Sequence, residues 1–366
     1  MIKLKYNFQV ELNLGKEFSG INSMTKLMSF ANSKAIAFGW KKNRESSASE
    51  LNYWLAEITR EGIRYRILPA EIIQQFKLVI SGSLHEDSTR TQIQAFKFGE
   101  AFGLLLGSEY IYLLDDIDAS PQLLKIENHF RLFSAPKYNS FKKDSHFMPV
   151  HCGNPSGNLL PVVFSSPEDS GNGGRHVCLL EIDEQSKQAK WLSTQELGIP
   201  RSTKFNDYKP YSKTGTGGAR LTNNSINMDL PPLIHDCAWI DEYWHLFVAG
   251  YNPVYQRDGV SPSILTRNHV DLSLHAPVFQ PVDESLAHIC ASLDRVIVSP
   301  FFSSGQRKGK QSIYVLNEGM EYELTLPRGY SKFAVQEYCD GVYWLTPGKL
   351  GFNSMPFNVV ACSAPD

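Results

Sequence analysis

The chain has 366 residues, with 36 lysines and arginines against 38 aspartates and glutamates, and 42% of its residues are hydrophobic. This composition is too apolar and too weakly charged for a disordered protein. The balanced charge offers no bulk attraction to nucleic acid or to a membrane surface. The length fits two average domains or one large all-β domain, and the scattered 26 glycines and 20 prolines indicate many turns.

The N-terminal segment has the pattern of a strand. Residues 2–12 alternate apolar and polar side chains, and they contain neither the apolar core nor the small-residue cleavage site of a signal peptide. No apolar run approaches the roughly 20 residues that a membrane-spanning helix needs. We therefore expect a soluble, cytoplasmic protein that has no membrane partner.

The cysteines indicate a reduced protein. None is close enough to another to form a CxxC pair, and most lie within apolar strand patterns. Free cysteines in such patterns behave as small buried apolar residues, so we expect structural thiols and not disulfides. The six are Cys152, Cys178, Cys237, Cys290, Cys339 and Cys362.

A hairpin pattern recurs along the chain. Each copy has a strand of small and apolar residues, a tight turn and a second, more apolar strand, as where 342–345 follow Asp340-Gly341. Asp-Gly between two apolar runs favours a two-residue hairpin. A further strand that ends in an acid or an asparagine follows, at Glu57, Asp115, Glu181 and Asn317.

Short strands with closely repeated turns are typical of an all-β repeat architecture. We predict a single-domain β-propeller with six blades of four antiparallel strands; a pair of β-sandwich domains is the alternative. The last unit is one strand short, so we expect strand 2–12 to complete it and close the ring. A seventh blade has room within residues 76–150. The six units are 24–75, 76–130, 131–230, 231–283, 284–328 and 329–366.

Two segments interrupt the repeat. Residues 69–76 predict a short helix with Pro69 in its first turn. Residues 198–232 are longer and more polar, and we expect them to form a loop inserted between two blades. Long loops in compact domains are usually functional or disordered.

Three histidines stand near the start of strands that open their units: His151, His235 and His288. The opening strand of a propeller blade is innermost, so these imidazoles would converge near the axis. Three imidazoles can bind a divalent transition metal and leave one position open for solvent or substrate. Histidines that only line the channel or pack within a blade are the simpler alternative, because no two of them have a close ligand spacing.

Other polar residues occupy neighbouring positions. Asp236 and Glu337 are candidate catalytic acid and base groups, or second-layer partners of a metal. The Asp236 segment also resembles the Asp-bearing strand of five-bladed glycosidases, which use two carboxylates across a pocket. Asn154 and Trp239, together with the three histidines, are candidate ligand-binding residues.

The segments around the histidines resemble one known family. Residues 151–159 are similar to the first histidine motif of the carotenoid cleavage oxygenases, residues 233–238 to the Met-Ile-His-Asp-Phe-Ala segment around the second, and residues 287–291 to the third. That family is a seven-bladed propeller that holds non-haem iron on four histidines, so the resemblance implies a metal on His151, His235 and His288. No histidine follows His288, and the fourth ligand is therefore missing from this chain.

The sequence contains neither a G-x-S-x-G nucleophile elbow nor a GxxxxGK[ST] phosphate loop. We therefore predict a non-catalytic binding or scaffold module that recognises a protein partner or a ligand at the top face of the ring and through the 198–232 loop. The alternative is a metal-dependent enzyme at the channel mouth, with Asp236 or Glu337 as acid or base.

Overall fold

The computed structural model describes a defined set of residues, and every element named in it is a β-strand, which agrees with the predicted all-β class. Among the described residues, no helix is both long and apolar enough to cross a membrane. The predicted helix at 69–76 falls almost entirely outside this set, and the predicted 198–232 loop falls outside it completely. The described residues are 2–13, 21–42, 51–69, 72, 93–127, 148–165, 176–183, 185–192, 233–240, 243–249, 264–271, 277–292, 295–300, 309–315, 318–328, 330, 333–347, 351–353 and 357–365.

The strands of the described residues form four sheets. A five-stranded sheet has the order β24 (Gly351–Asn353), β3 (Ile21–Phe30), β4 (Lys34–Lys42), β5 (Leu51–Thr59) and β6 (Gly62–Ile67). A four-stranded sheet has the order β2 (Lys5–Leu12), β25 (Phe357–Ser363), β23 (Val342–Thr346) and β22 (Ala334–Cys339).

One eight-stranded sheet consists of two antiparallel meanders that are joined at their last strands. The first meander is β7 (Ile93–Phe98), β8 (Ala101–Leu106), β9 (Tyr110–Leu114) and β10 (Gln122–Glu127). The second is β11 (Met148–Cys152), β12 (Leu159–Ser165), β13 (His176–Asp183) and β14 (Gln188–Trp191). The join is the parallel pairing of β10 with β14.

The other eight-stranded sheet is continuous through one long strand, β18 (Pro277–Ser292). The first part of β18 pairs with the preceding strand of the sheet, and its second part pairs with the following one. Before it come β15 (Leu233–Ile240), β16 (Tyr243–Ala249) and β17 (Ile264–Asp271). After it come β19 (Arg295–Pro300), β20 (Lys310–Val315), β21 (Met320–Thr325) and, at the edge, β1 (Ile2–Lys3).

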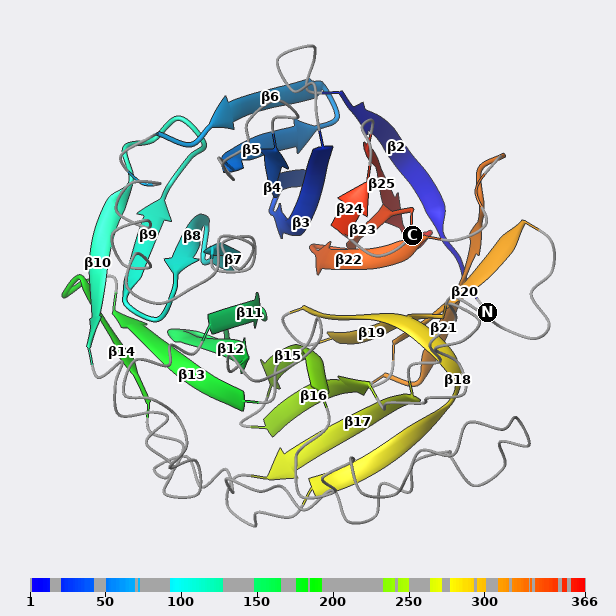
Figure 1. The fold of residues 1–366 in the computed structure, drawn as a ribbon. Coiled ribbons are helices and arrows are strands. Elements are labelled where there is room, and N and C mark those ends of the chain that lie inside the picture. The colour runs from blue at the N-terminus through cyan, green and yellow to red at the C-terminus, as the bar shows by residue number, and fades with distance from the viewer. Residues whose placement is uncertain are drawn as a thin grey trace, which may run out of the picture.

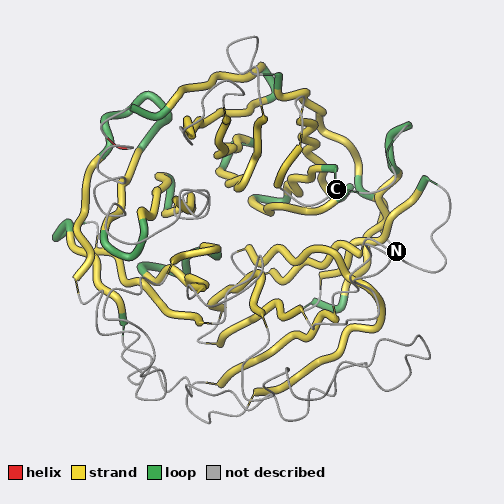
Figure 2. Tube along the Cα trace, viewed as in Figure 1, coloured by secondary structure: helices red, strands yellow, loops and turns green. Residues whose placement is uncertain are grey.

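The sheets are arranged as a closed ring. Figure 1 shows them standing around a common centre, with the chain running once round and the red C-terminal strands returning beside blue β3. The strands nearest the centre contact one another in turn: β3 contacts β7, β7 contacts β11, β11 contacts β15, β15 contacts β18, β18 contacts β22, and β22 contacts β3. Strands make up most of the described trace (Figure 2). This radial arrangement of antiparallel meanders is a β-propeller.

The N-terminal segment pairs with strands of two neighbouring sheets. β2 pairs antiparallel with β25, from Lys5 opposite Ser363 to Leu12 opposite Phe357, so it completes the last sheet as the strand count predicted. β1 pairs in parallel with β21, and the Leu4 amide donates to the Glu323 carbonyl at 2.9 Å. One segment therefore joins two neighbouring sheets.

The core lies between sheets. Apolar faces of neighbouring meanders meet in four clusters of buried residues, of which one joins β3–β5 to β7–β9 and another joins the last sheet to the first. Trp54 and Trp344, both fully buried, belong to the latter. The six cysteines are buried and free, as predicted.

Turn chemistry sets the hairpins at the inner strands. Asn32 and Ser33 both have positive φ between β3 and β4, and so do Asp340 and Gly341 between β22 and β23. Cys339 pairs with Val342 across a two-residue loop, as in a type I′ turn, whose twist matches the flanking strands. Phe30 pairs with Lys34, so the loop between β3 and β4 has three residues. These are two of the predicted hairpins.

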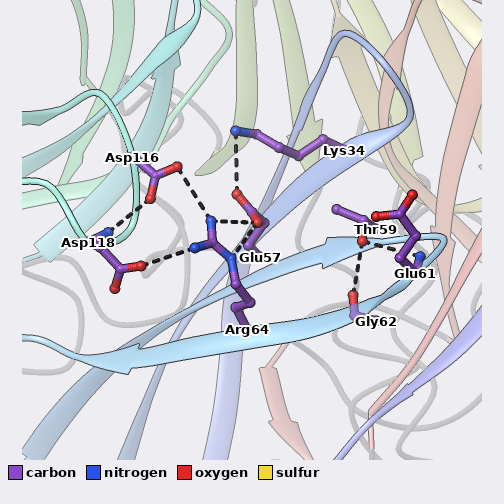
Figure 3. Close-up of polar contacts among 8 residues, drawn as sticks. All are labelled: Lys34, Glu57, Thr59, Glu61, Gly62, Arg64, Asp116 and Asp118. Carbon is purple, nitrogen blue, oxygen red and sulfur yellow. Dashed lines mark hydrogen bonds and ion pairs between the residues drawn. The ribbon is translucent and has the colours of Figure 1, made fainter.

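An ion network ties β6 to the neighbouring meander (Figure 3). The Arg64 guanidinium lies 2.8 Å from Glu57 of β5, and it reaches Asp118 at 3.1 Å and Asp116 at 3.5 Å in the turn after β9. Lys34 approaches the other oxygen of Glu57 at 3.4 Å. Arg64 is largely exposed, so the network is a surface link between two sheets.

Candidate functional site at the ring axis

β-Bulges occur at corresponding places in the innermost strands. In five of the six inner strands the pairing with the outer neighbour skips one residue, and an ionisable residue follows the skipped one, whereas β7 pairs with β8 without a skip. A bulge bends the strand and re-aims the side chains beside it, and bulges are frequent next to functional sites. The post-bulge residues are Lys26 on β3, His151 on β11, Asp236 on β15, His288 on β18 and Glu337 on β22.

Side chains from three inner segments meet at the axis. Lys26 Nζ donates to the carbonyl oxygen of Cys152 at 3.0 Å and lies 3.7 Å from Glu337 Oε1. The other carboxylate oxygen of Glu337 accepts from Asn154 Nδ2 at 3.2 Å. We call Lys26, Asn154 and Glu337 the axial cluster. It links the inner strand β3 to β22 and to the segment that follows β11.

The axial cluster is poorly solvated. The side chain of Lys26 is 14% exposed and that of Glu337 is 2% exposed. Removing two charges from water is costly, and it is tolerated where the charges face each other and polar groups complete their hydrogen bonds. Beside the cluster, burial raises the pKa of the Cys152 thiol to about 12, although nearby Lys26 opposes the rise, so this thiol stays neutral at physiological pH.

Gly153 lets the β11 segment approach its neighbour. A Cβ atom at this position would lie 2.1 Å from the backbone carbonyl oxygen of Cys237 on β15, closer than real atoms approach. The Gly153 amide donates to the Pro161 carbonyl at 2.9 Å, which continues the hairpin. Only glycine fits here, and the close approach fixes Cys152 and Asn154 on either side of it.

The structure brings some of the predicted residues together. Asn154 and Glu337 are hydrogen-bonded, and His151 is half-buried on β11 with its Cα opposite Val163. Trp239, a predicted ligand-binding residue, is buried on β15 with 7% exposure.

The backbone register separates the three predicted metal ligands. His151 and His288 hold the post-bulge position, whereas His235 is itself the skipped residue of its bulge, one place before Asp236. The side chains of His235, Asp236 and His288 lie outside the described part of the structure. Among the described side chains, no group of three histidine, cysteine or acidic residues is placed to hold a metal ion. The metal site therefore stays a prediction.

Sequence reasoning missed the lysines of the axis. Lys26 lies within the first predicted unit, 24–75, but it was not named among the candidate site residues. The signal was present, because Lys26 stands the same distance before its turn as Asp236 and His288 stand before theirs. Lys97 on β7 was also missed, and its Nζ atom lies 3.5 Å from Cys339 Sγ on β22.

A cavity of about 530 Å³ lies away from the axis, between the first and second meanders of the β7–β14 sheet. Its polar lining includes Glu127, Glu181 and Asp183, with Lys190 2.8 Å from Glu181. Asn158 donates to Glu181 at 3.1 Å, and hydrogen bonds from Ser186 hold the pKa of Asp183 below its usual value. The carboxylates of Glu181 and Asp183 are therefore largely engaged within the protein.

Known proteins resemble the chain in structure only. No family model matches it, and no curated protein matches its sequence. A luciferin-regenerating enzyme is 8% identical with a TM-score of 0.44, over 98% of this chain and 96% of that one. YCF48 from Cyanidioschyzon merolae is 10% identical with a TM-score of 0.41, over 98% of each chain, and YCF48 bound to a D1 peptide is 8% identical with a TM-score of 0.36, over 100% and 98%. None of these similarities assigns a function to this chain, and the resemblance to carotenoid cleavage oxygenases gains no support from them.

Proposed function

We propose that the protein is a six-bladed β-propeller that acts as a non-catalytic binding module and recognises a protein partner or a ligand at the top face of its axial channel. The top face is the one at which the inner strands begin. The observation that carries this proposal is the ionisable residue directly after the bulge in each of five inner strands. In β11, β15 and β22 that residue is the fourth of its strand, near the entering end.

The energetics of the axial cluster favour recognition over simple packing. An apolar plug would fill the inner ends of the blades at lower cost than a lysine and a glutamate that have left water. Buried polar groups that converge from several elements are the usual means by which a concave site orients a ligand. A rigid ring that holds them supplies the preorganisation.

Two finer parts of the proposal have their own support. The number of blades, six, is supported by the closed order of inner-strand contacts among β3, β7, β11, β15, β18 and β22. A cytoplasmic location is consistent with six buried cysteines that form no disulfide.

Affinity capture with matched variants tests the proposal. The wild-type protein, Asn154→Ala, Lys26→Met and a surface control, Lys125→Met on the exposed side of β10, serve as baits under identical conditions. We expect partners or ligands that bind wild type and the control to be lost from both axial variants, provided that circular dichroism shows all four folded. An identical bound set for all four baits would refute recognition at the axis.

One observation keeps a metal-dependent enzyme as the second candidate. His151 and His288 occupy the same post-bulge position on β11 and β18, and this shared backbone position supports the candidate. Elemental analysis of the purified protein and of His151→Ala tests it. Stoichiometric transition metal that the variant loses would support the enzyme and contradict a purely binding role, whereas a metal-free wild type after growth with added metals would eliminate it.

A further inference from the structure

Lys97 of β7 contacts the inner strands of two other sheets, β3 and β22. It is the penultimate residue of β7, next to the turn into β8. Its Nζ atom lies 5.2 Å from the ring centroid of Phe30 on β3 and 3.5 Å from Cys339 Sγ on β22. Phe30 and Cys339 are the last residues of their strands, so the ammonium group stands at the hairpin end of the axial channel.

The surroundings of Lys97 differ from those of three other partly buried lysines, Lys26, Lys34 and Lys310. Within the described residues, no carboxylate lies within 4 Å of Lys97 Nζ, although the residue is half-buried. Three other partly buried lysines each approach a glutamate: Lys26 and Glu337 at 3.7 Å, Lys34 and Glu57 at 3.4 Å, and Lys310 and Glu323 at 2.7 Å.

The two groups that Lys97 Nζ contacts, a thiol and an aromatic ring, carry no negative charge. A thiol is a weak acceptor, and an aromatic face attracts a cation less strongly than a carboxylate does. Burial raises the pKa of the Cys339 thiol, and although Lys97 opposes this rise, the thiol is neutral at physiological pH. An ammonium group has three hydrogens to donate, so Lys97 retains donors for a further acceptor.

From this geometry we propose that Lys97 anchors a carboxylate group of the ligand at the hairpin end of the axial channel. The inference rests on the proposed function, because it names the chemistry of a ligand of the same axial channel; the hairpin end that holds Lys97 lies opposite the top face. A carboxylate is preferred to a phosphate because Glu337 and Asp340 both act on the Cys339 sulfur electrostatically. The negative charges of Glu337 and Asp340 oppose the binding of a doubly charged phosphate more than that of a singly charged carboxylate.

An NMR titration of the full-length protein with acetate tests the inference. Methyl-labelled methionine reports on the site, because Met28 lies on β3 within the same buried cluster as Phe30. We expect a saturable shift of the Met28 methyl signal with acetate in wild type. Lys97→Met, which keeps the aliphatic chain over Phe30, should weaken acetate binding by at least about tenfold, whereas Lys97→Arg and the control Lys125→Met should retain it.

Each other outcome has a defined meaning. A wild-type protein that shows no saturable shift overturns the inference, and so does acetate binding that survives in Lys97→Met. Phosphate that binds at least as tightly as acetate contradicts the choice of a carboxylate. If Lys97→Met does not fold, Lys97→Gln replaces it. The two experiments separate the two proposals. If acetate does not bind but partner capture still depends on Lys26 and Asn154, only this inference is refuted. If acetate binds at Lys97 but capture does not depend on Lys26 and Asn154, only the proposed function is refuted.

Discussion

Replacing Lys26 by methionine tests the physical account of the axis. The substitution keeps the aliphatic stem and removes the ammonium group, which lies 3.7 Å from a Glu337 carboxylate that is only 2% exposed. At that distance and an effective dielectric constant of about 20, the lost attraction is about 4 kcal/mol. Side-chain relaxation and water entry reduce this, and we expect Lys26→Met to lower the free energy of unfolding by roughly 2–4 kcal/mol.

A double-mutant cycle in urea separates the ion pair from other effects. Glu337→Gln alone should also destabilise the protein, because it leaves the Lys26 ammonium without its carboxylate. In Lys26→Met with Glu337→Gln both charges are absent, and the glutamine oxygen can still accept from Asn154. We expect the double variant to recover most of the loss, with a coupling energy of at least about 2 kcal/mol.

The cycle can refute the reasoning. If Lys26→Met costs less than about 0.5 kcal/mol, or if the two single losses add without coupling, the pair behaves as a solvated surface ion pair. The axial cluster would then be neither a poorly solvated charge pair nor an argument for recognition. Lys125→Met, on the exposed face of β10, should change stability by no more than about 0.5 kcal/mol.

Three further outcomes follow from the fold. Deleting residues 1–12 removes β1 and β2 and exposes the edges of two sheets, so calorimetry should show a much lower or broadened melting transition and light scattering should show association. Burial raises the pKa of the Cys152 and Cys362 thiols to about 12, so at pH 8 both should resist iodoacetamide in the native protein and react only after unfolding, as mass spectrometry would detect. Arg64 is 55% exposed, so Arg64→Ala should cost less than about 1 kcal/mol in urea unfolding, and the difference from wild type should shrink at high salt.

Each of these outcomes has a control. Deleting residues 1–4 leaves β2 in place and should lower the melting temperature far less than the longer deletion; equal effects would contradict the closing role of β2. Alkylation of either thiol in the native protein as fast as in the unfolded one would contradict its burial. A loss above about 2 kcal/mol for Arg64→Ala, or one insensitive to salt, would show that the network is more than a surface link, and Arg60→Ala provides the matched comparison.

The hairpins could be predicted because their signals are local. Asp340-Gly341 and Asn32-Ser33 accept positive φ, and apolar runs flank both pairs, so a few neighbouring residues suffice to specify each turn. The alternation of residues 2–12 also identified a strand. Because the last unit was one strand short, its sheet was the predicted partner of this strand. The Phe8 ring accordingly packs edge-on against Trp344 at 5.6 Å between centroids.

The candidate site could be predicted only in part. Sequence reasoning chose Asn154 and Glu337 from their places at strand starts, and these two side chains are hydrogen-bonded. It missed Lys26, because a lysine within a strand has no local signature of burial. It also treated His151, His235 and His288 as equivalent, whereas the bulges place His235 one residue out of step. A bulge depends on how two strands pair, which no short stretch of sequence determines.

The sequence by itself determined an all-β chain of repeated hairpins, buried cysteines in the reduced thiol form and an N-terminal strand that needed a partner. Turn chemistry and alternation act within a few residues, so one chain segment carries enough information for each of these. Only the tertiary structure decided that Lys26, Asn154 and Glu337 meet, and that Lys97 stands beside Cys339 with no carboxylate among its described neighbours. The contact between Lys26 and Cys152 joins residues 126 positions apart, and the contact between Lys97 and Cys339 joins residues 242 positions apart. Residues so distant in the sequence come together only because the ring closes.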